Sequence, residues 1–116
     1  MIASNVGSTA YSFSAGGVPL PFGDHLFAFT PNNQIKPIIV GPLVLSSSDV
    51  IRADVYDPSF RPAVAIADSK RFGAKIQSVR VSLAKDEKYS LMFDPDNLPH
   101  AKIAKIQFPR PSTCGR

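Results

Sequence analysis

Hydroxyl and aromatic side chains gather in one short stretch near the start of this 116-residue sequence. From Gly7 to Gly17 the residues read Gly-Ser-Thr-Ala-Tyr-Ser-Phe-Ser-Ala-Gly-Gly. Ser and Thr favour a helix start, where backbone N–H groups without intrahelical partners bind anions, and Gly-Gly favours a helix end. An aromatic ring beside such a helix start suits a nucleotide. We therefore predict one short helix over residues 9–15, capped by Ser8 or Thr9, at the edge of a nucleotide site.

The other side chains that could do chemistry are scattered. Asp68 follows a run of small or apolar residues, where the local pattern favours a turn residue, and we do not expect a catalytic base there. His25 and His100 stand alone, so we interpret both as structural or solvated. The acids at 86–87 and 94–96 are typical of polar turns. Since the lone Cys114 excludes an intrachain disulfide and a cysteine metal site, we predict no metal site.

Composition and charge limit the class of protein. A chain with 44% hydrophobic and 19% charged residues is expected to fold as one globular domain. The net charge of +4 suits a phosphate-bearing ligand as well as nucleic acid, but the basic residues form no run, so we predict no nucleic-acid partner. No apolar run approaches the roughly 20 residues of a membrane helix, and no signal peptide is recognisable. We expect a cytoplasmic protein that does not bind a membrane.

The local patterns favour a mainly β chain. Eleven prolines argue against long helices, and short apolar or alternating segments lie between them. Strands are predicted at residues 26–29, 50–56, 63–67, 79–83 and 90–93. A second short helix is predicted at residues 97–106, followed by a flexible tail at 109–116. The predicted fold is an irregular, multi-stranded β-sandwich with one short N-terminal helix and one short C-terminal helix.

The string from Gly7 to Gly17 resembles the signature of the NAD kinase family, Gly-Ser-Thr-Ala-Tyr-Ser-x-Ser-Ala-Gly-Gly. Further segments resemble the same family, namely Phe29-Thr30-Pro31, Gly41-Pro42-Leu43-Val44-Leu45 with Gly in place of Arg, residues 61–68, and Leu91-Met92-Phe93-Asp94-Pro95 followed by residues 103–108 as in alphaproteobacterial-type members. The resemblance covers residues 1–108. It implies the β-rich C-terminal, NAD-binding domain of that family.

The activity implied by this resemblance is transfer of a phosphoryl group from ATP, with a divalent metal such as Mg²⁺, to the 2′-hydroxyl of the adenosine ribose of NAD, giving NADP. By position, the resemblance assigns NAD-binding roles to Val6, Thr9, Ala10, Tyr11, Ser12, Phe13, Ser14 and Asp68. Thr9 would offer a hydroxyl, and Tyr11 would pack its ring against the base or ribose. Val6 stands where the family often has a hydroxyl group. Lys70 would either contact a phosphate or be solvated.

The family's Gly-Gly-Asp-Gly loop, whose aspartate is the general base, is absent from these 116 residues, as is its Asn-Glu/Asp pair. The resemblance assigns both to an N-terminal α/β domain. We therefore predict no catalytic residue here and expect the NAD-binding part of an NAD kinase, inactive alone, whose partner is that domain or further copies in a homo-oligomer. A surface built for such a partner would leave an exposed apolar patch. The alternatives are a non-catalytic NAD(P)-binding or oligomer-assembly module and a relative of the lipid kinases.

Overall fold

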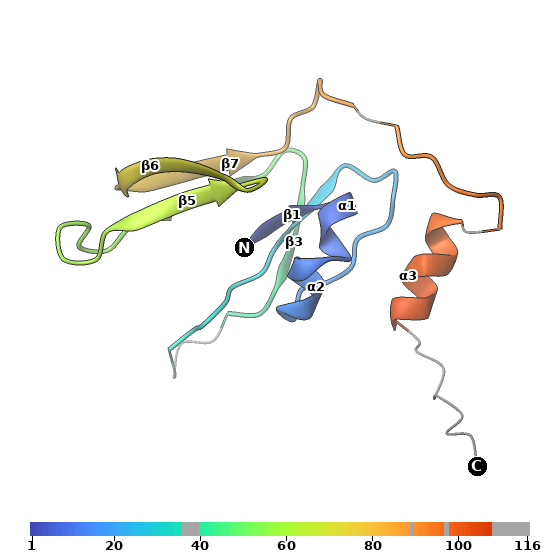
Figure 1. Cartoon of the computed structure of the whole chain (residues 1–116), viewed down its shortest axis with the longest axis horizontal. Helices are drawn as coiled ribbons and strands as arrows, with labels where there is room; N and C mark the ends of the chain where they lie inside the picture. The colour runs from blue at the N-terminus through green and yellow to red at the C-terminus, as the bar shows by residue number, and fades with distance from the viewer. Residues whose placement is uncertain (36–39, 89, 97, 108–116) are drawn as a thin grey trace, which may run out of the picture. The chain divides into compact units, whose positions relative to one another are not determined.

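A computed structural model of the chain describes residues 1–35, 40–88, 90–96 and 98–107, the side chains at 99, 100, 102 and 107 excepted. The fold is mainly β, as predicted, with small antiparallel sheets and a few short helices (Figure 1). The chain divides into two compact units, Met1–Ser47 with Leu83–Arg116, and Ser48–Ser82. Packing of the sheets as a sandwich stays a prediction, as does one domain over residues 1–108.

The first unit contains an antiparallel sheet with the order β1 (Ile2–Ser4), β2 (Leu26–Phe29) and β3 (Leu43–Ser46). The central strand, β2, was predicted from its uninterrupted apolar run. Its two middle residues, Phe27 and Ala28, are adjacent in the strand and are 2% and 0% exposed. Because successive side chains of a strand point to opposite faces, both faces of β2 are covered. This strand is the core of the first unit.

Two four-residue helices, α1 (Asn5–Ser8) and α2 (Tyr11–Ser14), take the place of the single helix predicted over residues 9–15. The predicted cap is also wrong. Ser4 and Ala10 occupy the N-cap positions, and neither makes a side-chain capping hydrogen bond.

Ser8 does not cap a helix because its hydroxyl has two other partners. It donates to the carbonyl oxygen of Asn5 at 2.6 Å and accepts from the backbone N–H of Leu20 at 2.9 Å. Ser8 is fully buried and Leu20 is 1% exposed. The hydroxyl thus fastens the segment that follows the second helix to the first helix.

Gly16 and Gly17 end α2, as the sequence predicts. The N–H of Gly16 donates to Phe13 O at 2.9 Å and that of Gly17 to Ser12 O at 2.8 Å, which is the paired bonding of a Schellman motif. Gly16 has φ +86°, a left-handed conformation that favours glycine. A Cβ on Gly17 would lie 2.5 Å from Thr30 Oγ1 and 2.6 Å from Ser12 O, so no larger residue fits there.

The second unit consists of two strand pairs, β4 (Val50–Asp54) with β7 (Ser78–Ser82) and β5 (Ala63–Ala67) with β6 (Lys70–Ile76), both antiparallel. Three of these strands overlap the predicted ones. The fourth, β6, was not predicted, because Gly73 and charged residues break any apolar alternation. Asp68 and Ser69 connect β5 to β6 with φ +47° and +65°, as a two-residue hairpin turn requires.

The described C-terminal part holds α3 (Pro99–Gln107), which confirms the second predicted helix; position 97 and the predicted tail at 109–116 lie outside the described residues. Residues 90–93, predicted as a strand, form neither helix nor strand. None of the sheets among the described residues includes this segment, so it has no paired strand there. Among the described residues, no helix has the length and apolarity needed to cross a membrane.

The close approach at Gly17 gives a stability prediction. Gly17→Ala should lower the free energy of unfolding by about 1–3 kcal/mol, because the new methyl group overlaps buried atoms. Gly41→Ala is the matched control, since nothing lies within 4 Å of a Cβ there, and it should change stability by less than about 0.5 kcal/mol. Urea unfolding measures both. Equal effects of the two substitutions would contradict the close packing described.

Candidate functional site

The motif of residues 7–17 has an inner face made of hydroxyl groups. Ser12 is 2% exposed, and its Oγ lies 3.0 Å from Oγ1 of Thr30, which is 1% exposed. A buried hydroxyl without a partner is costly, so each of these two groups satisfies the other. Ser12 and Ser8 therefore fix the backbone of α1 and α2. The hydroxyl of Ser12 points away from any ligand on the outer face.

The outer face of the motif carries the other predicted residues of the motif itself. Tyr11 is 69% exposed and Phe13 40% exposed, and Ala10 and Ser14 are also exposed. Thr9 is half-buried, and its Oγ1 lies 3.5 Å from Val6 O, at the limit of a hydrogen bond. An aromatic ring held beside small polar residues on a fixed backbone can stack on a flat ring of a ligand.

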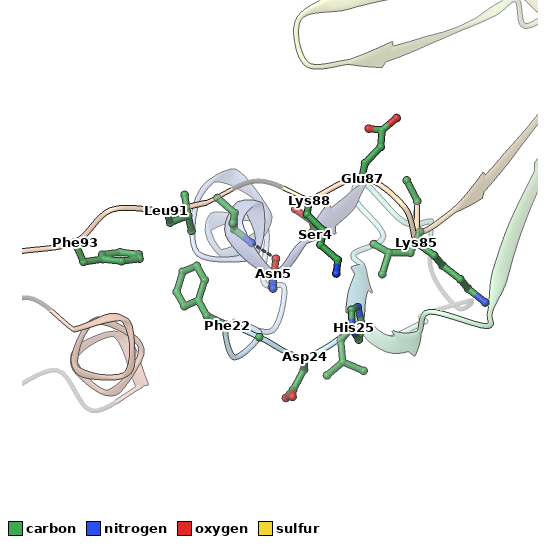
Figure 2. Close-up of a pocket in the computed structure, with 15 residues that line it drawn as sticks. Ser4, Asn5, Phe22, Asp24, His25, Lys85, Glu87, Lys88, Leu91 and Phe93 are labelled. Carbon is green, nitrogen blue, oxygen red and sulfur yellow. Dashed lines mark hydrogen bonds between the residues drawn. The ribbon is translucent and has the colours of Figure 1, made fainter.

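Val6 lines a hollow of about 490 Å³ within the first unit. Figure 2 shows this hollow with most of its lining residues labelled. In this hollow the rings of Phe22 and Phe93 pack edge to face, with their centroids 5.8 Å apart. Its lining is Ser4, Asn5, Val6, Phe22, Gly23, Asp24, His25, Leu26, Leu83, Ala84, Lys85, Glu87, Lys88, Leu91 and Phe93. A mostly apolar hollow of this size with a few polar groups is typical of small-molecule sites.

The charged side chains around this hollow and the one histidine in its lining point in different directions. Figure 2 shows the side chains of Asp24, Glu87 and Lys85 extending outward from the group of lining residues, whereas His25 lies beside the middle of it. Sequence reasoning missed this hollow. The segment Leu91-Met92-Phe93-Asp94-Pro95 resembles the family but assigns no site, and the lining residues that follow the second unit reach the hollow only through the fold. His25, interpreted as structural or solvated, is an exposed lining residue.

Asp68 lies in the second unit, as the first residue of the β5–β6 turn, and is exposed. Its turn role is thereby accounted for, and a ligand contact by Asp68 or by the neighbouring Lys70 stays a prediction. The side chain of His100 lies outside the described ones. The described residues include no group of three or more His, Cys, Asp or Glu side chains that could hold a metal ion.

The sequence of this chain is similar to those of several known proteins. An NAD kinase of Zymomonas mobilis is 33% identical over 108 residues, and one of Mesorhizobium japonicum is 36% identical over 108 residues. Both matches span 93% of this chain. The chain is related to the NAD kinase family. An NAD kinase of Rickettsia canadensis, 34% identical over the same share of the chain, agrees.

These NAD kinases are longer than the region they share with this chain. The match covers 42% of the length of each of the three relatives, so the chain spans about two-fifths of a curated NAD kinase. No protein-family model matches the chain, and no solved structure matches it. The relationship to NAD kinases was predicted from the motif, whereas the narrower resemblance to alphaproteobacterial-type members stays a prediction.

The two faces of the motif give a second prediction. Ser12→Ala should destabilise the chain by about 1–3 kcal/mol, because it leaves the buried hydroxyl of Thr30 without a partner. Ser14→Ala removes the same group from the exposed face of the same helix and should cost less than about 0.5 kcal/mol. Thermal and urea unfolding of the two variants measure the difference. A larger loss for Ser14→Ala would reverse the assignment of the faces.

Proposed function

We propose that this chain is the NAD-binding part of an NAD kinase, corresponding to the family's C-terminal β domain, and that it serves phosphorylation of the 2′-hydroxyl of the adenosine ribose by ATP. The observation that supports this most directly is the NAD kinase homology over 93% of the chain, together with the resemblance of residues 7–17 to the family's signature. The whole activity would need groups that these 116 residues do not contain, above all a Gly-Gly-Asp-Gly loop.

In this proposal the outer face of the motif holds NAD. The ring of Tyr11 stacks on the adenine or packs on the ribose, while Phe13, two residues further along the helix, gives a separate apolar contact on another side of α2. Thr9, Ala10 and Ser14 contribute backbone groups and hydroxyls at the edge of the ligand. Ser12 acts as a positioning residue, because its hydroxyl is bonded to Thr30 inside the unit. The wall at Val6 accepts an apolar part of NAD without donating a hydrogen bond.

ATP and a divalent metal belong to the complete reaction. A divalent metal would supply charge neutralisation at the phosphates of ATP during phosphoryl transfer, and a positioned carboxylate would take the proton of the attacking hydroxyl. Nothing places Asp68 in that carboxylate role, since its position is explained by the hairpin turn. We assign this chain the binding and orientation of NAD.

NAD binding should depend on Tyr11. In a calorimetric titration with NAD, Tyr11→Ala should weaken binding about tenfold or more, which corresponds to the roughly 1–3 kcal/mol of a base–aromatic stack. Tyr56→Ala removes the same side chain from another exposed position, 91% exposed, and should change Kd less than twofold. Equal loss of affinity in the two variants would contradict a role for the motif in binding.

Turnover tests the catalytic part of the proposal separately. The purified 116-residue chain, incubated with NAD, ATP and Mg²⁺, should form no NADP above the uncatalysed background, because the groups that activate the hydroxyl and hold ATP are not among its residues. Chromatographic detection of NADP measures this. Clear formation of NADP would overturn the claim that the chain is inactive alone, while leaving NAD binding by the motif intact.

A second candidate function is assembly, as a non-catalytic module of a homo-oligomer. It is favoured by large apolar side chains that lie open on the second unit, where Phe60 is 77% and Ile66 70% exposed. That these exposed side chains together form the expected apolar patch stays a prediction. Sedimentation that shows self-association, together with no detectable binding of NAD, would favour this function over the first.

A further inference from the structure

The strand pair β4–β7 places two arginines directly opposite each other. Arg52 and Arg80 are Cα partners in the antiparallel register, so their side chains share one face of the pair with Cβ atoms about 4.5–5.5 Å apart. Like charges in directly opposite positions destabilise a strand pair. The two arginines therefore do not stabilise the strand pair themselves, and a bound anion between them would remove their repulsion.

The burial of the opposite face of β4 and β7 shows that the two arginines lie on the solvent-exposed face. Ile51, Val79 and Val81 alternate with the arginines and are partly buried, so the apolar face packs inward. The arginine face is the outer one, and the Arg52 side chain is 71% exposed. Both guanidinium groups can therefore meet a ligand from solution.

The charge of the two arginines is only partly neutralised within the chain. Nε of Arg52 donates to Oδ1 of Asp54 at 2.9 Å, which leaves the terminal N–H groups of Arg52 available. The Arg80 side chain makes no ion pair and no hydrogen bond with another described residue. One positive charge thus stays uncompensated on a face that already carries a like-charged pair.

A hollow on this face is lined by Val50, Arg52, Ser78 and Arg80. The two guanidinium forks and the hydroxyl of Ser78 are all hydrogen-bond donors, and all three come from alternate positions on one face. We propose that this hollow binds a phosphate group, as free phosphate or as a phosphate monoester, between Arg52 and Arg80. The site lies in the second unit and does not depend on the function proposed above.

Phosphate fits this donor set better than a single carboxylate does. Each guanidinium donates two parallel hydrogen bonds to an oxyanion, and the several oxygens of one phosphate can serve both forks together with a hydroxyl. A carboxylate has two oxygens and is matched by one fork. A doubly charged phosphate also removes the repulsion between the arginines, so binding should stabilise the strand pair.

Nitrogen-15 NMR of the full chain tests the site with two probes, inorganic phosphate and glycerol 3-phosphate, at constant ionic strength set with chloride. Saturable shifts should appear at the terminal N–H groups of Arg52, at the Nε–H group of Arg80 and at the amide of Ser78. Saturation by either probe supports the site, and the probe that binds more tightly identifies the source of the group. Arg80→Gln should weaken binding at least tenfold.

Arg61→Gln is the matched control, because it removes an exposed arginine of the same unit that does not line the hollow, and it should change Kd less than twofold. Equal weakening by both substitutions, or shifts that chloride reproduces, would overturn the proposal as non-specific charge screening. Saturable shifts with polyglutamate but with neither phosphate probe would also overturn it, in favour of a protein carboxylate as the partner.

Thermal unfolding shows whether the Arg80→Gln variant still folds, and gives a second test of phosphate binding. Without phosphate, Arg80→Gln should unfold at the same temperature as the unaltered chain or higher, because a like-charge pair has been removed. Phosphate should raise the unfolding temperature of the unaltered chain and leave that of Arg80→Gln unchanged. An equal rise in both proteins would contradict binding between the arginines.

Discussion

The hydrogen bond between the hydroxyls of Ser12 and Thr30 joins the motif to the core of the first unit. Thr30 directly follows β2, the strand covered on both faces, and Ser12 belongs to α2, so one bond connects the central strand to the helix. Gly17 passes so close to both residues that any side chain there would overlap them. The conformation of the whole motif depends on this contact, because a four-residue helix has little stability of its own.

Within the motif, the buried side chains hold the backbone in place and the exposed side chains are left to contact a ligand. Ser8 and Ser12 point inward and hold the backbone, whereas Tyr11 and Phe13 point outward on the same short elements. A ligand surface is most precise when its backbone is held by satisfied, buried bonds and its contact groups remain free. The chemistry of the motif therefore follows from burial as much as from residue type: hydroxyls that look alike in the sequence differ in what they can reach.

Much of the fold could be predicted from local patterns, and the exceptions have a common physical cause. The apolar run of β2, the alternation in β4 and the glycine end of α2 are decided by nearby residues, and each was predicted. The capping assignment failed because Ser8 bonds to Leu20, twelve residues away, which no local pattern reveals.

The hollow beside α1 was not predicted for the same reason, since its lining residues from Leu83 onward reach it only through the fold. The NAD kinase relationship was visible in the motif itself, while the direction in which each hydroxyl points was not.

The central claim is that the outer face of α2 touches NAD. Intermolecular nuclear Overhauser effects between NAD and the chain test it directly, because they report proton pairs in contact. The account predicts cross-peaks from the ring protons of Tyr11 to the adenine or ribose protons of NAD. Cross-peaks confined to other aromatic residues, such as Tyr56 or Phe60, would contradict it.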